Sequence, residues 1–358
     1  MQKTFVLIVG GGPAGSTVAR YLSKKGIENI LVQKNCEYRK PCGGGIRYTA
    51  FKEFSLEENI VEKKVKNIII GFKKKRIHIN IEKTPIYIVD RRKFDKYLRK
   101  KAKEEGTHIL EGNFVDFYFE KDFIISKIKT KEREIYIKSK YLVAADGVNS
   151  LIRKKLFKEY IPRIPVNYID ISEIQIEDCH FYFGNKIAYK YYAWVFPHFE
   201  GGNIGTYKGR LENFLKFLNL KSYTKPKGFF IPLWKDNISL FKDRIFFVGD
   251  SAGQVLPFTF EGIYYAMASG KILAESFLKE NPSLEYKKKW EERFLKQFKS
   301  LKILQEIFLK NDLTIYFMIK LFENKYIQKE MIKLWLGERD IKINLGFFLR
   351  AFKRAFLK

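Results

Sequence analysis

Three glycines near the start of the chain have a spacing that suits the binding of a dinucleotide. Residues 6–16 read VLIVGGGPAGS, in which Gly10, Gly12 and Gly15 follow the pattern G-x-G-x-x-G. The first glycine permits a tight turn, the second lets backbone N–H groups approach a pyrophosphate, and the third lets a helix pack on a strand. The N-terminus of that helix then faces the phosphates. Because a buried strand pattern precedes this stretch and a helical pattern follows it, the sequence predicts a dinucleotide site.

The position that normally contacts the ribose holds an amide in this chain. An acidic residue at the end of the second strand usually accepts hydrogen bonds from ribose hydroxyls. Here Gln33 holds that place, 18 residues after Gly15. Its amide oxygen can accept the same hydrogen bonds without a charge, and Glu37 is the alternative acceptor. We therefore expect adenosine binding to be retained.

Two aspartates further along the chain narrow the prediction from any dinucleotide to FAD. Asp146 lies in VAADGVNSLIR at 143–153, and Asp250 lies in IFFVGDSAGQVLPFTFEGI at 245–263. A carboxylate at the end of a buried strand is suited to binding ligand hydroxyls. Either aspartate alone would also fit a structural role as a helix or turn cap. Together the two segments resemble the Asp-Gly and Gly-Asp motifs of flavoproteins related to aromatic hydroxylases. The resemblance implies FAD as the dinucleotide, with Asp250 beside its ribityl chain.

The elements that would position these residues alternate between strands and helices. A buried strand at 4–9, a helix that ends before Gly26 and a second strand at 28–34 form the unit of a parallel sheet. The rest of the pattern predicts alternating strands over 67–89, a basic helix over 91–105, short strands over 109–138, a buried strand at 141–146, aromatic-rich strands over about 160–235, a buried strand at 244–249, a helix over 262–279 and amphipathic helices over 284–358.

The chain also resembles the geranylgeranyl reductase family in four stretches. These are KPCGGGI at 40–46, VDRRKFDKYL at 89–98, YAWVFPH at 192–198 and GDSAGQVLPFTFEGIYYAMASGKILAE at 249–275. The resemblance implies an FAD-dependent oxidoreductase of lipid biosynthesis that saturates carbon–carbon double bonds of a polyprenyl lipid or quinone side chain. Hydride would come from N5 of the reduced flavin, and a proton would be added to the other carbon.

The motifs and the resemblance together imply which residues form the site. Cys42 matches the family's active-site cysteine, and we expect it, or a water that it positions, to deliver the proton, with Tyr192 and His198 as alternatives. The simpler interpretation of Cys42 is a small buried side chain. The predicted cofactor contacts are Gly10, Gly12, Pro13, Ala14, Gly15, Gln33, Lys34, Cys42, Gly43, Gly44, Arg91, Asp146, Gly249, Asp250, Pro257, Gly262 and Ile263. The predicted substrate pocket consists of Tyr192, Trp194, Phe196, Pro197 and Phe260.

Two positions depart from the family pattern. Where relatives commonly have Thr-Gly-Glu-Gly-Ile, this chain has Phe260 between Thr259 and Glu261. His198 stands where a lysine commonly follows Phe-Pro. Each departure leaves the predicted fold intact and leaves the identity of the substrate open.

We predict an α/β fold with a Rossmann-like FAD-binding domain of the glutathione reductase and aromatic hydroxylase type, an inserted antiparallel-sheet substrate domain and a helical C-terminus. At 358 residues and 46% apolar, the chain has enough material for one large core or two smaller ones. The predicted divisions are 1–66, 85–160 and 240–280 for a discontinuous FAD-binding domain, 67–84 and 161–239 for the substrate domain, and 281–358 for the C-terminal helical region.

Composition narrows the class of partner. The chain has 68 Lys and Arg against 40 Asp and Glu, a formal charge of +28, which favours phosphorylated substrates or an anionic membrane surface. A skewed genome composition explains the same excess equally well. We expect no nucleic acid partner, because no helix-turn-helix, RNP-type or zinc-finger motif occurs. Three cysteines without a Cys/His cluster indicate a reduced intracellular protein with no metal site.

The lengths of the apolar stretches in the sequence indicate where in the cell the protein resides. No stretch reaches the roughly 18 apolar residues that a membrane span requires, and no cleavable signal region precedes the first strand, so we expect a cytoplasmic protein. Residues 341–358, IKINLGFFLRAFKRAFLK, have Phe and Leu opposite Lys and Arg. That pattern suits either an amphipathic helix on an anionic membrane or a helix packed on the body of the protein. Peripheral contact with the inner face of the membrane is thus left open.

Other flavin functions fit the same nucleotide motifs. They are a flavin-dependent monooxygenase or halogenase, a lycopene cyclase-like enzyme, and a non-enzymatic basic flavoprotein at a membrane. No second glycine motif provides for a nicotinamide nucleotide, so the reductant is either NAD(P)H bound transiently or a ferredoxin.

Overall fold

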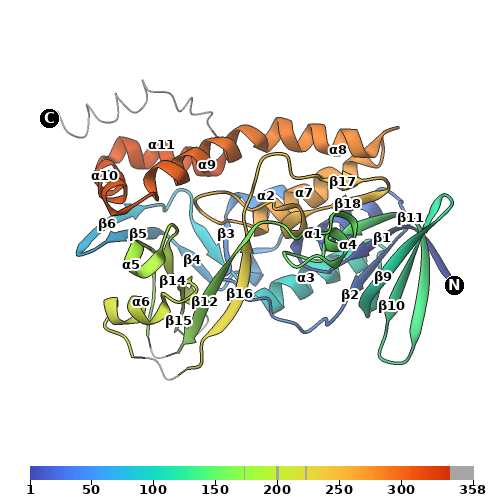
Figure 1. The fold of residues 1–358 in the computed structure, drawn as a ribbon, viewed down its shortest axis with the longest axis horizontal. Helices are drawn as coiled ribbons and strands as arrows, with labels where there is room; N and C mark the ends of the chain where they lie inside the picture. Colours follow the sequence, from blue (N-terminus) through green and yellow to red (C-terminus); the bar gives the residue numbers. More distant parts are fainter. Residues whose placement is uncertain (173, 199–200, 222–223, 339–358) are drawn as a thin grey trace.

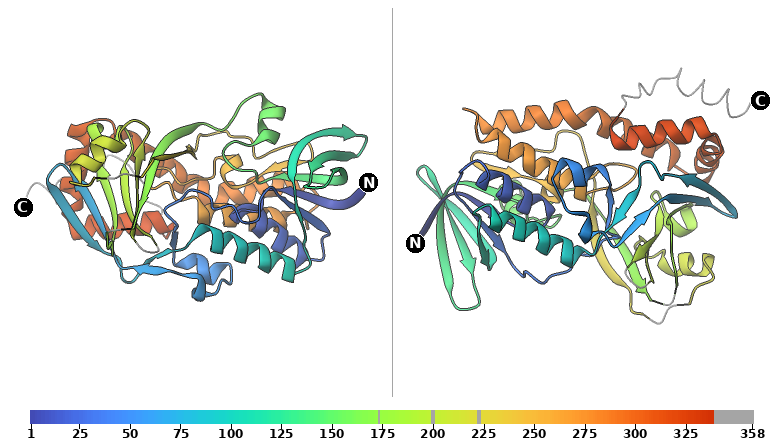
Figure 2. Two further views of the ribbon diagram at one scale, coloured as in Figure 1. Left: turned by 90° about the horizontal axis from the view of Figure 1, so that it is seen from below. Right: turned by 180° about the vertical axis from the view of Figure 1, so that it is seen from behind.

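Two large β-sheets lie side by side along the long axis of the molecule, and the C-terminal helices run along one edge of both (Figures 1 and 2). The computed structural model describes residues 1–172, 174–198, 201–221 and 224–338. The predicted α/β fold class is confirmed. The amphipathic helix predicted at 341–358 lies outside the described residues.

The first sheet is built around the glycine motif and has eight strands. Five of them are parallel, in the order β18, β11, β1, β2 and β8. Residues 6–9 of β1 are at most 5% exposed, as expected for the centre of a parallel sheet covered on both faces. The strands are β1 (Gln2–Val9), β2 (Asn29–Gln33), β8 (His108–Glu111), β9 (Asn113–Glu120), β10 (Phe123–Lys129), β11 (Glu134–Ala144), β17 (Phe241–Lys242) and β18 (Ile245–Phe247).

The second large sheet joins two segments that lie far apart in the sequence. Its order is β16-β12-β15-β14-β13-β5-β6, and all neighbouring pairs are antiparallel except β13 and β5. We call it the substrate sheet. Its strands are β5 (Asn67–Phe72), β6 (Lys75–Asn80), β12 (Arg163–Ile171), β13 (Cys179–Phe183), β14 (Ala193–His198), β15 (Gly201–Tyr207) and β16 (Lys227–Pro232), and a separate small sheet contains β3 (Gly45–Arg47), β4 (Lys63–Val65) and β7 (Ile86–Ile88).

The helices form three groups, namely those around the first sheet, the short α5 and α6 beside the substrate sheet, and a C-terminal row (Figure 1). The crossover from β1 to β2 is α1, which packs against α3 and α7. In the C-terminal row, α10 packs on β5, so the row covers one end of the substrate sheet (Figure 1). The helical elements are α1 (Pro13–Ser23), α2 (Thr49–Glu53), η1 (Glu58–Ile60), α3 (Arg91–Glu104), α4 (Leu151–Phe157), α5 (Asn185–Ala188), α6 (Leu211–Phe217), η2 (Gly249–Ala252), α7 (Ile263–Ser276), α8 (Pro282–Trp290), a π-helical turn η3 (Glu291–Leu295), α9 (Lys296–Phe308), α10 (Asp312–Phe322) and α11 (Lys325–Leu336).

Two predictions about the elements were wrong. The strand expected separately at 141–146 is the second half of β11, which runs unbroken because its first half pairs with β10 and its second half with β18. The stretch expected as strands over 160–235 contains α6, which buries Leu211 and Phe214 at helical spacing. The division of the chain into domains stays a prediction.

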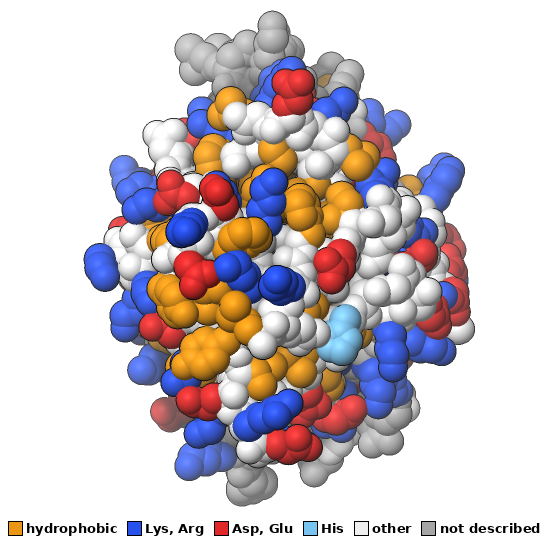
Figure 3. All heavy atoms as spheres, turned by 90° about the vertical axis from the view of Figure 1, so that its right-hand side faces the viewer, with side chains coloured by type: hydrophobic (Ala, Val, Ile, Leu, Met, Phe, Trp, Pro, Cys, Tyr) orange, Lys and Arg blue, Asp and Glu red, His pale blue; other side chains and the backbone are white. Residues whose placement is uncertain are grey.

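The end of the molecule formed by β9, β10 and β11 carries exposed aromatic side chains (Figure 3). Tyr118, Phe119, Phe123 and Tyr136 are each between 39% and 52% exposed, and Lys138 lies over the Phe123 ring at 4.6 Å. On this face lysines and arginines alternate with acidic and apolar side chains, so the positive charge is dispersed rather than gathered in one patch (Figure 3). None of the described helices combines the length and the apolar character that a bilayer crossing requires.

Candidate functional site

The glycine motif forms the turn between β1 and α1, and its three glycines lie in different surroundings. Gly10 has a φ of +103°, and a Cβ there would lie 2.3 Å from the carbonyl oxygen of Ala145. A Cβ on Gly15 would lie 1.9 Å from the carbonyl oxygen of Gly10, so α1 packs directly on the turn. A Cβ on Gly12 would meet no atom within 4 Å. The space beyond the N-terminus of α1 is therefore open, and no side chain caps that helix.

Gln33 supports this turn from the end of β2. Its Oε1 atom accepts a hydrogen bond of 2.6 Å from the backbone N–H of Gly11. Its Nε2 atom donates to the carbonyl oxygen of Asn35 at 2.9 Å. The amide thus fixes the turn, and a contact between Gln33 and a ribose stays a prediction.

Two buried arginines that were not expected from the sequence hold the same region together. Arg99 of α3 donates to the carbonyl oxygens of Gly11, at 2.9 Å, and of Cys36, at 2.6 Å. Arg153 of α4 donates to the carbonyl oxygen of Ser251 at 2.6 Å, which joins the two aspartate motifs. The only signal in the sequence was their position, because Arg153 is the last residue of the 143–153 stretch and Arg99 directly follows the 89–98 stretch.

Asp146 offers an unpaired acceptor at the end of β11. Its Oδ2 atom accepts hydrogen bonds from the N–H groups of Leu151, at 2.9 Å, and Ile152, at 3.5 Å, and so caps α4. Its Oδ1 atom is buried and has no hydrogen-bond partner among the described residues. Burial raises the pKa of this carboxyl group to about 6, although a hydrogen bond from Ser150 and backbone N–H groups act in the opposite direction. A buried carboxylate oxygen without a donor is what a ligand hydroxyl would satisfy.

Asp250 lies in η2, directly after the β18 strand and the glycine at 249. Its Oδ2 atom accepts a hydrogen bond of 2.5 Å from Nζ of Lys40, a residue of the Cys42 loop. Gly262 precedes α7, and a Cβ there would lie 3.7 Å from Oδ1 of Asp250 and 3.2 Å from a methyl group of Val255. Glycine at 262 therefore keeps the approach to the carboxylate open.

Cys42 lies in the loop before β3, next to a buried cation. Its sulfur accepts a hydrogen bond of 3.4 Å from the N–H of Gly44 and also faces the guanidinium group of Arg91. Arg91 is 4% exposed and binds Asp95 through two hydrogen bonds of 2.9 and 3.0 Å. Burial lowers the pKa of Arg91, but Asp95 and Cys42 raise it by more, so it lies above its ordinary value and the cation beside the thiol stays charged.

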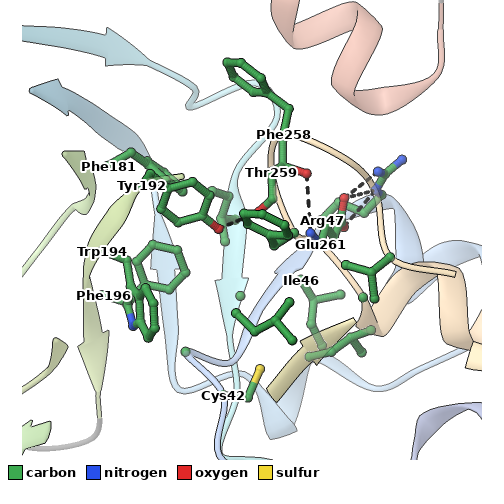
Figure 4. A pocket seen from close by; sticks show the side chains of 18 of the residues that line it. Cys42, Ile46, Arg47, Phe181, Tyr192, Trp194, Phe196, Phe258, Thr259 and Glu261 are labelled. Atoms are coloured by element: carbon green, nitrogen blue, oxygen red, sulfur yellow. Dashed lines mark hydrogen bonds and ion pairs between the residues drawn. The ribbon is translucent and has the colours of Figure 1, made fainter. Parts of the chain in front are cut away.

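A cavity of about 280 Å³ extends from Cys42 between the substrate sheet and the C-terminal helices (Figure 4). Its walls are mostly apolar and include Met331, Ile332 and Trp335 of α11. Among the predicted site residues, its lining contains Pro13, Cys42, Gly43, Gly44, Arg91, Tyr192, Trp194, Phe196, Asp250, Phe260, Gly262 and Ile263. The predicted residues outside this lining are Gly10, Gly12, Ala14, Gly15, Gln33, Lys34, Asp146, Pro197, His198, Gly249 and Pro257.

The alternation of β14 explains which of its residues reach the cavity. Trp194 and Phe196 point into it from one face of the strand (Figure 4). Pro197 lies on the other face, where Val195 packs into a separate core. His198 ends the strand, and its Nε2 atom contacts Nη2 of Arg39. Burial, and then Arg39, lower the pKa of His198. The structure therefore places Pro197 and His198 outside the lining, away from the roles the sequence suggested.

Tyr192 reaches the loop that precedes α7. Its hydroxyl donates a hydrogen bond of 2.6 Å to the carbonyl oxygen of Thr259 (Figure 4). Burial raises the pKa of Tyr192 above its ordinary value. The hydroxyl proton is thus engaged by the loop, which fits a positioning role.

A buried ion pair that was not expected from the sequence ties the loop to α11. Arg47 is 1% exposed and binds the Glu261 carboxylate through contacts of 2.5 to 3.1 Å. It also donates to the carbonyl oxygens of Trp335, at 3.0 Å, and Leu336, at 3.1 Å, at the end of α11. The Trp335 indole N–H donates to Glu261 at 2.8 Å. Burial lowers the pKa of Arg47, but Glu261 and Tyr265 raise it above its ordinary value.

These features fit a bound FAD. The open N-terminus of α1 at Gly12 suits a pyrophosphate, and the free acceptor on Asp146 and the carboxylate of Asp250 suit hydroxyl groups. A family model described as FAD binding domain matches residues 3–214. The chain belongs to the FAD binding domain family. FAD is accordingly its cofactor, as predicted.

Relatives of this FAD binding domain protein are named for prenyl reduction. The chain is 28% identical to geranylgeranyl diphosphate reductase of Arabidopsis thaliana, over 98% of this chain and 86% of the relative. It is 28% identical to digeranylgeranylglycerophospholipid reductase of Methanocaldococcus jannaschii, over 84% of this chain and 87% of the relative. A geranylgeranyl bacteriochlorophyll reductase-like protein from Thermoplasma acidophilum has the same fold, with a TM-score of 0.77, 22% identity and coverage of 100% and 98% of the two chains. The predicted resemblance to geranylgeranyl reductases is thus confirmed, and with it an FAD-dependent oxidoreductase.

Proposed function

We propose that this protein saturates carbon–carbon double bonds of polyprenyl chains, with FAD as its redox cofactor. The observation that carries the proposal is the continuous cavity. It begins at Cys42, Asp250 and Gly262, which we expect beside FAD, and continues between apolar side chains as far as Trp335. Such walls suit a long hydrocarbon and offer few partners to a polar substrate. The relatives are named for substrates that carry geranylgeranyl groups, which are hydrocarbon chains of this kind.

The aromatic wall suits the charge that the reaction develops. An isolated prenyl double bond is not polarised, so hydride addition at one carbon needs protonation of the other. Bound FAD, when reduced, supplies the hydride. Phe181, Trp194 and Phe196 turn their rings toward the cavity, where π-faces stabilise positive character on the more substituted carbon and exclude water (Figure 4).

Cys42 is our candidate for the proton donor to the double-bond carbon that does not receive the hydride. Its sulfur lies in the cavity lining, and the charged Arg91 group faces it. When the thiol releases its proton, Arg91 stabilises the thiolate that remains. Tyr192 is a weaker candidate, because its hydroxyl donates to a backbone carbonyl and burial raises its pKa. His198 lies outside the lining, which makes it the weakest of the three.

We propose that the electrons reach FAD from NAD(P)H or from a ferredoxin. The net charge of +28 favours an acidic protein partner and also favours phosphate groups. A polyprenyl lipid resides in a membrane, so we further propose peripheral contact with a membrane surface during substrate uptake. A flotation assay with anionic and neutral vesicles tests this contact, and equal recovery from both would contradict an electrostatic contribution.

An anaerobic single turnover tests the proposed reaction. The bound flavin is reduced chemically, a geranylgeranyl lipid or a polyprenyl quinone is added, and flavin colour and product mass are followed. We expect the colour of oxidised flavin to return while the lipid gains two hydrogens for each saturated bond. Return of the colour only when oxygen is admitted would instead favour a monooxygenase or halogenase.

A pair of cysteine variants tests the proton donor. Cys42→Ala should lower the rate of lipid reduction about 100-fold or more, the usual contribution of a general acid, while FAD content stays at the wild-type level. The matched control is Cys36→Ala, since Cys36 is also a half-buried free thiol but is not part of the cavity lining. Its rate should equal that of the wild type. A Cys42→Ala enzyme with unimpaired turnover would remove Cys42 from the mechanism.

A further inference from the structure

The loop that leads into α7 contains two aromatic residues in a backbone conformation that normally favours glycine. Phe258 has a φ of +73° and Phe260 a φ of +55°. Both values lie in the left-handed region, where a bulky side chain is strained. A glycine at 260, the residue that the family pattern has there, would adopt this conformation without strain. The chain thus retains a ring at a position where the backbone disfavours one.

Contacts on both sides hold this strained loop in place. The carbonyl oxygen of Thr259 accepts the 2.6 Å hydrogen bond from Tyr192, which belongs to the substrate sheet side of the cavity. On the opposite side, the Glu261 carboxylate is bound by the buried Arg47. Phe260 lies between these two anchors in the chain. Its ring is therefore held at the boundary between the substrate sheet and the residues expected beside the flavin.

The Phe260 side chain is among those that line two spaces inside the protein. On one side it lines the main cavity together with Tyr192 and Trp194. The same three side chains, with Tyr191 and Tyr207, also line a second space beneath the substrate sheet, of only about 10 Å³. The centroid of the Phe260 ring lies 5.5 Å from that of Tyr192 and 5.8 Å from that of Tyr191. The second space holds at most about one water molecule, so the side chains around it are closely packed and the Phe260 ring fills volume beside the main cavity.

We propose that Phe260 restricts the enzyme to substrates with a single prenyl chain, because its ring fills the volume beside the main cavity that a second chain would need. This inference rests on the proposed function. The main cavity gives one apolar path from Cys42, past β13 and β14, to α11, which suits one hydrocarbon chain. A lipid with two prenyl chains on one head group needs a second apolar space beside the first. The ring fills the point where that space would open, so Phe260 determines specificity without acting in the chemistry.

Selectivity between two lipids tests the proposal. FAD-loaded wild type, Phe260→Gly, Phe260→Ala and the control Phe258→Ala are reduced anaerobically and offered a one-chain geranylgeranyl lipid or a diether lipid with two geranylgeranyl chains. Both Phe260 variants should raise the ratio of two-chain to one-chain rates about tenfold or more. Phe258→Ala removes a ring from the same loop, but from a residue that lines only the main cavity, and should leave the ratio unchanged. An unchanged ratio in both Phe260 variants overturns the proposal.

Binding and unfolding measurements separate this proposal from the proposed function. Fully saturated one-chain and two-chain analogues are added to the same proteins, and the shift in unfolding temperature reports binding. Only the Phe260 variants should be stabilised by the two-chain analogue. Equal stabilisation of the wild type by both analogues overturns the inference and leaves the proposed function standing. The wild type could also fail to reduce any prenyl lipid while only the Phe260 variants are stabilised by the two-chain analogue. In that case the proposed function is wrong, and the exclusion of a second chain by Phe260 is supported.

Backbone strain gives a third measurement that does not depend on a lipid. Phe260→Gly and Phe260→Ala remove the same ring, but only glycine tolerates a φ of +55° without strain. Phe260→Gly should therefore unfold at a higher temperature than Phe260→Ala. The reverse order would show that position 260 is not held in the left-handed conformation and would contradict the argument.

Discussion

In the cofactor half of the site, close backbone contacts and the space expected for the ligand favour glycine, whereas in the substrate half large side chains enclose the space. A Cβ on Gly15 would overlap a carbonyl oxygen, and a Cβ on Gly12 would occupy open space at the N-terminus of α1. Around the cavity, Trp194 and Phe196 form the wall by their volume. The first kind of constraint requires one residue type, while the second requires only a size. The spacing of the glycines therefore indicates which cofactor binds. The large aromatic side chains indicate only that the substrate is apolar.

The two halves of the site also differ in whether their buried charged groups have hydrogen-bond partners. Asp146 keeps one carboxylate oxygen buried and without a donor among the described residues. Arg47 and Glu261, in contrast, satisfy each other and the end of α11. An unsatisfied buried group is costly unless a ligand completes it, whereas a fully paired group stabilises the scaffold once formed. An unpaired buried group such as Asp146 is therefore a candidate ligand contact, whereas the paired Arg47 and Glu261 stabilise the cavity walls.

Removal of the paired charge should have the largest effect. Arg47→Met leaves the Glu261 carboxylate buried without its partner and should lower the free energy of unfolding by about 4 kcal/mol. Urea unfolding measures this change. The double variant Arg47→Met with Glu261→Leu should recover part of the loss, because no unpaired charge remains. If Arg47→Met is as stable as the wild type, the pairing of Arg47 with Glu261 does not stabilise the fold and the contrast with Asp146 is wrong.

Two glycine variants should separate packing from ligand binding. Gly15→Ala forces a Cβ against the Gly10 carbonyl oxygen and should cost about 3 kcal/mol of stability. Gly12→Ala meets no protein atom, so its stability should change by less than about 1 kcal/mol. It should nevertheless bind FAD about tenfold more weakly or worse, because its methyl group enters the space expected for the pyrophosphate. Wild-type FAD affinity in Gly12→Ala, measured by flavin fluorescence, would contradict that placement.

Asp146 should make stability depend on pH. Its pKa is about 6 in the folded protein against an ordinary value of 3.8, so the folded state holds this proton more tightly than the unfolded state. The stabilisation is fully present below about pH 3.8 and is lost as pH rises toward 6, up to about 3 kcal/mol in total. The difference in unfolding free energy between wild type and Asp146→Asn should therefore fall across this window. A difference that is constant with pH would mean that the carboxyl group is not perturbed.

The smallest expected effect concerns the hydrogen bond that anchors the strained loop. Tyr192→Phe removes the donor to the Thr259 carbonyl oxygen and should lower the unfolding free energy by about 1 kcal/mol. Tyr191→Phe is the matched control, since Tyr191 is a neighbouring half-buried tyrosine whose ring stacks on Tyr207. A larger loss in the control than in Tyr192→Phe would show that the loop is held by other contacts.

The cofactor half was predictable from the sequence because its constraints are local. The roles of Gly10, Gly12 and Gly15 follow from a few neighbouring residues, and the matching family model supports the same cofactor. The pairing of Arg47 with Glu261 was not predictable, since 214 residues separate them and no local pattern relates them. Arg99 and Arg153 were missed for the same reason, because each binds backbone groups far away in the chain.

The substrate half was predictable only in part. The stretch around Trp194 and Phe196 was correctly assigned to a strand with aromatic residues, and both side chains line the cavity. Successive residues of a strand point to opposite faces, so Pro197 lies on the face opposite Phe196. The family motif alone does not indicate which of its residues share a face. The ends of elements also depend on distant partners, as the unbroken β11 and the helix α6 illustrate.

The position of α11 has a consequence for the order in which the molecule is assembled during synthesis. Met331, Ile332 and Trp335 line a cavity whose walls also contain much earlier residues, among them Phe181 and Trp194. A chain made from its N-terminus can form β13 and β14 well before these residues leave the ribosome. Until then the aromatic faces of both strands are open to water. The nascent protein therefore carries an apolar surface that a chaperone would cover, and α11 both completes the described lining of the cavity and ends that exposure.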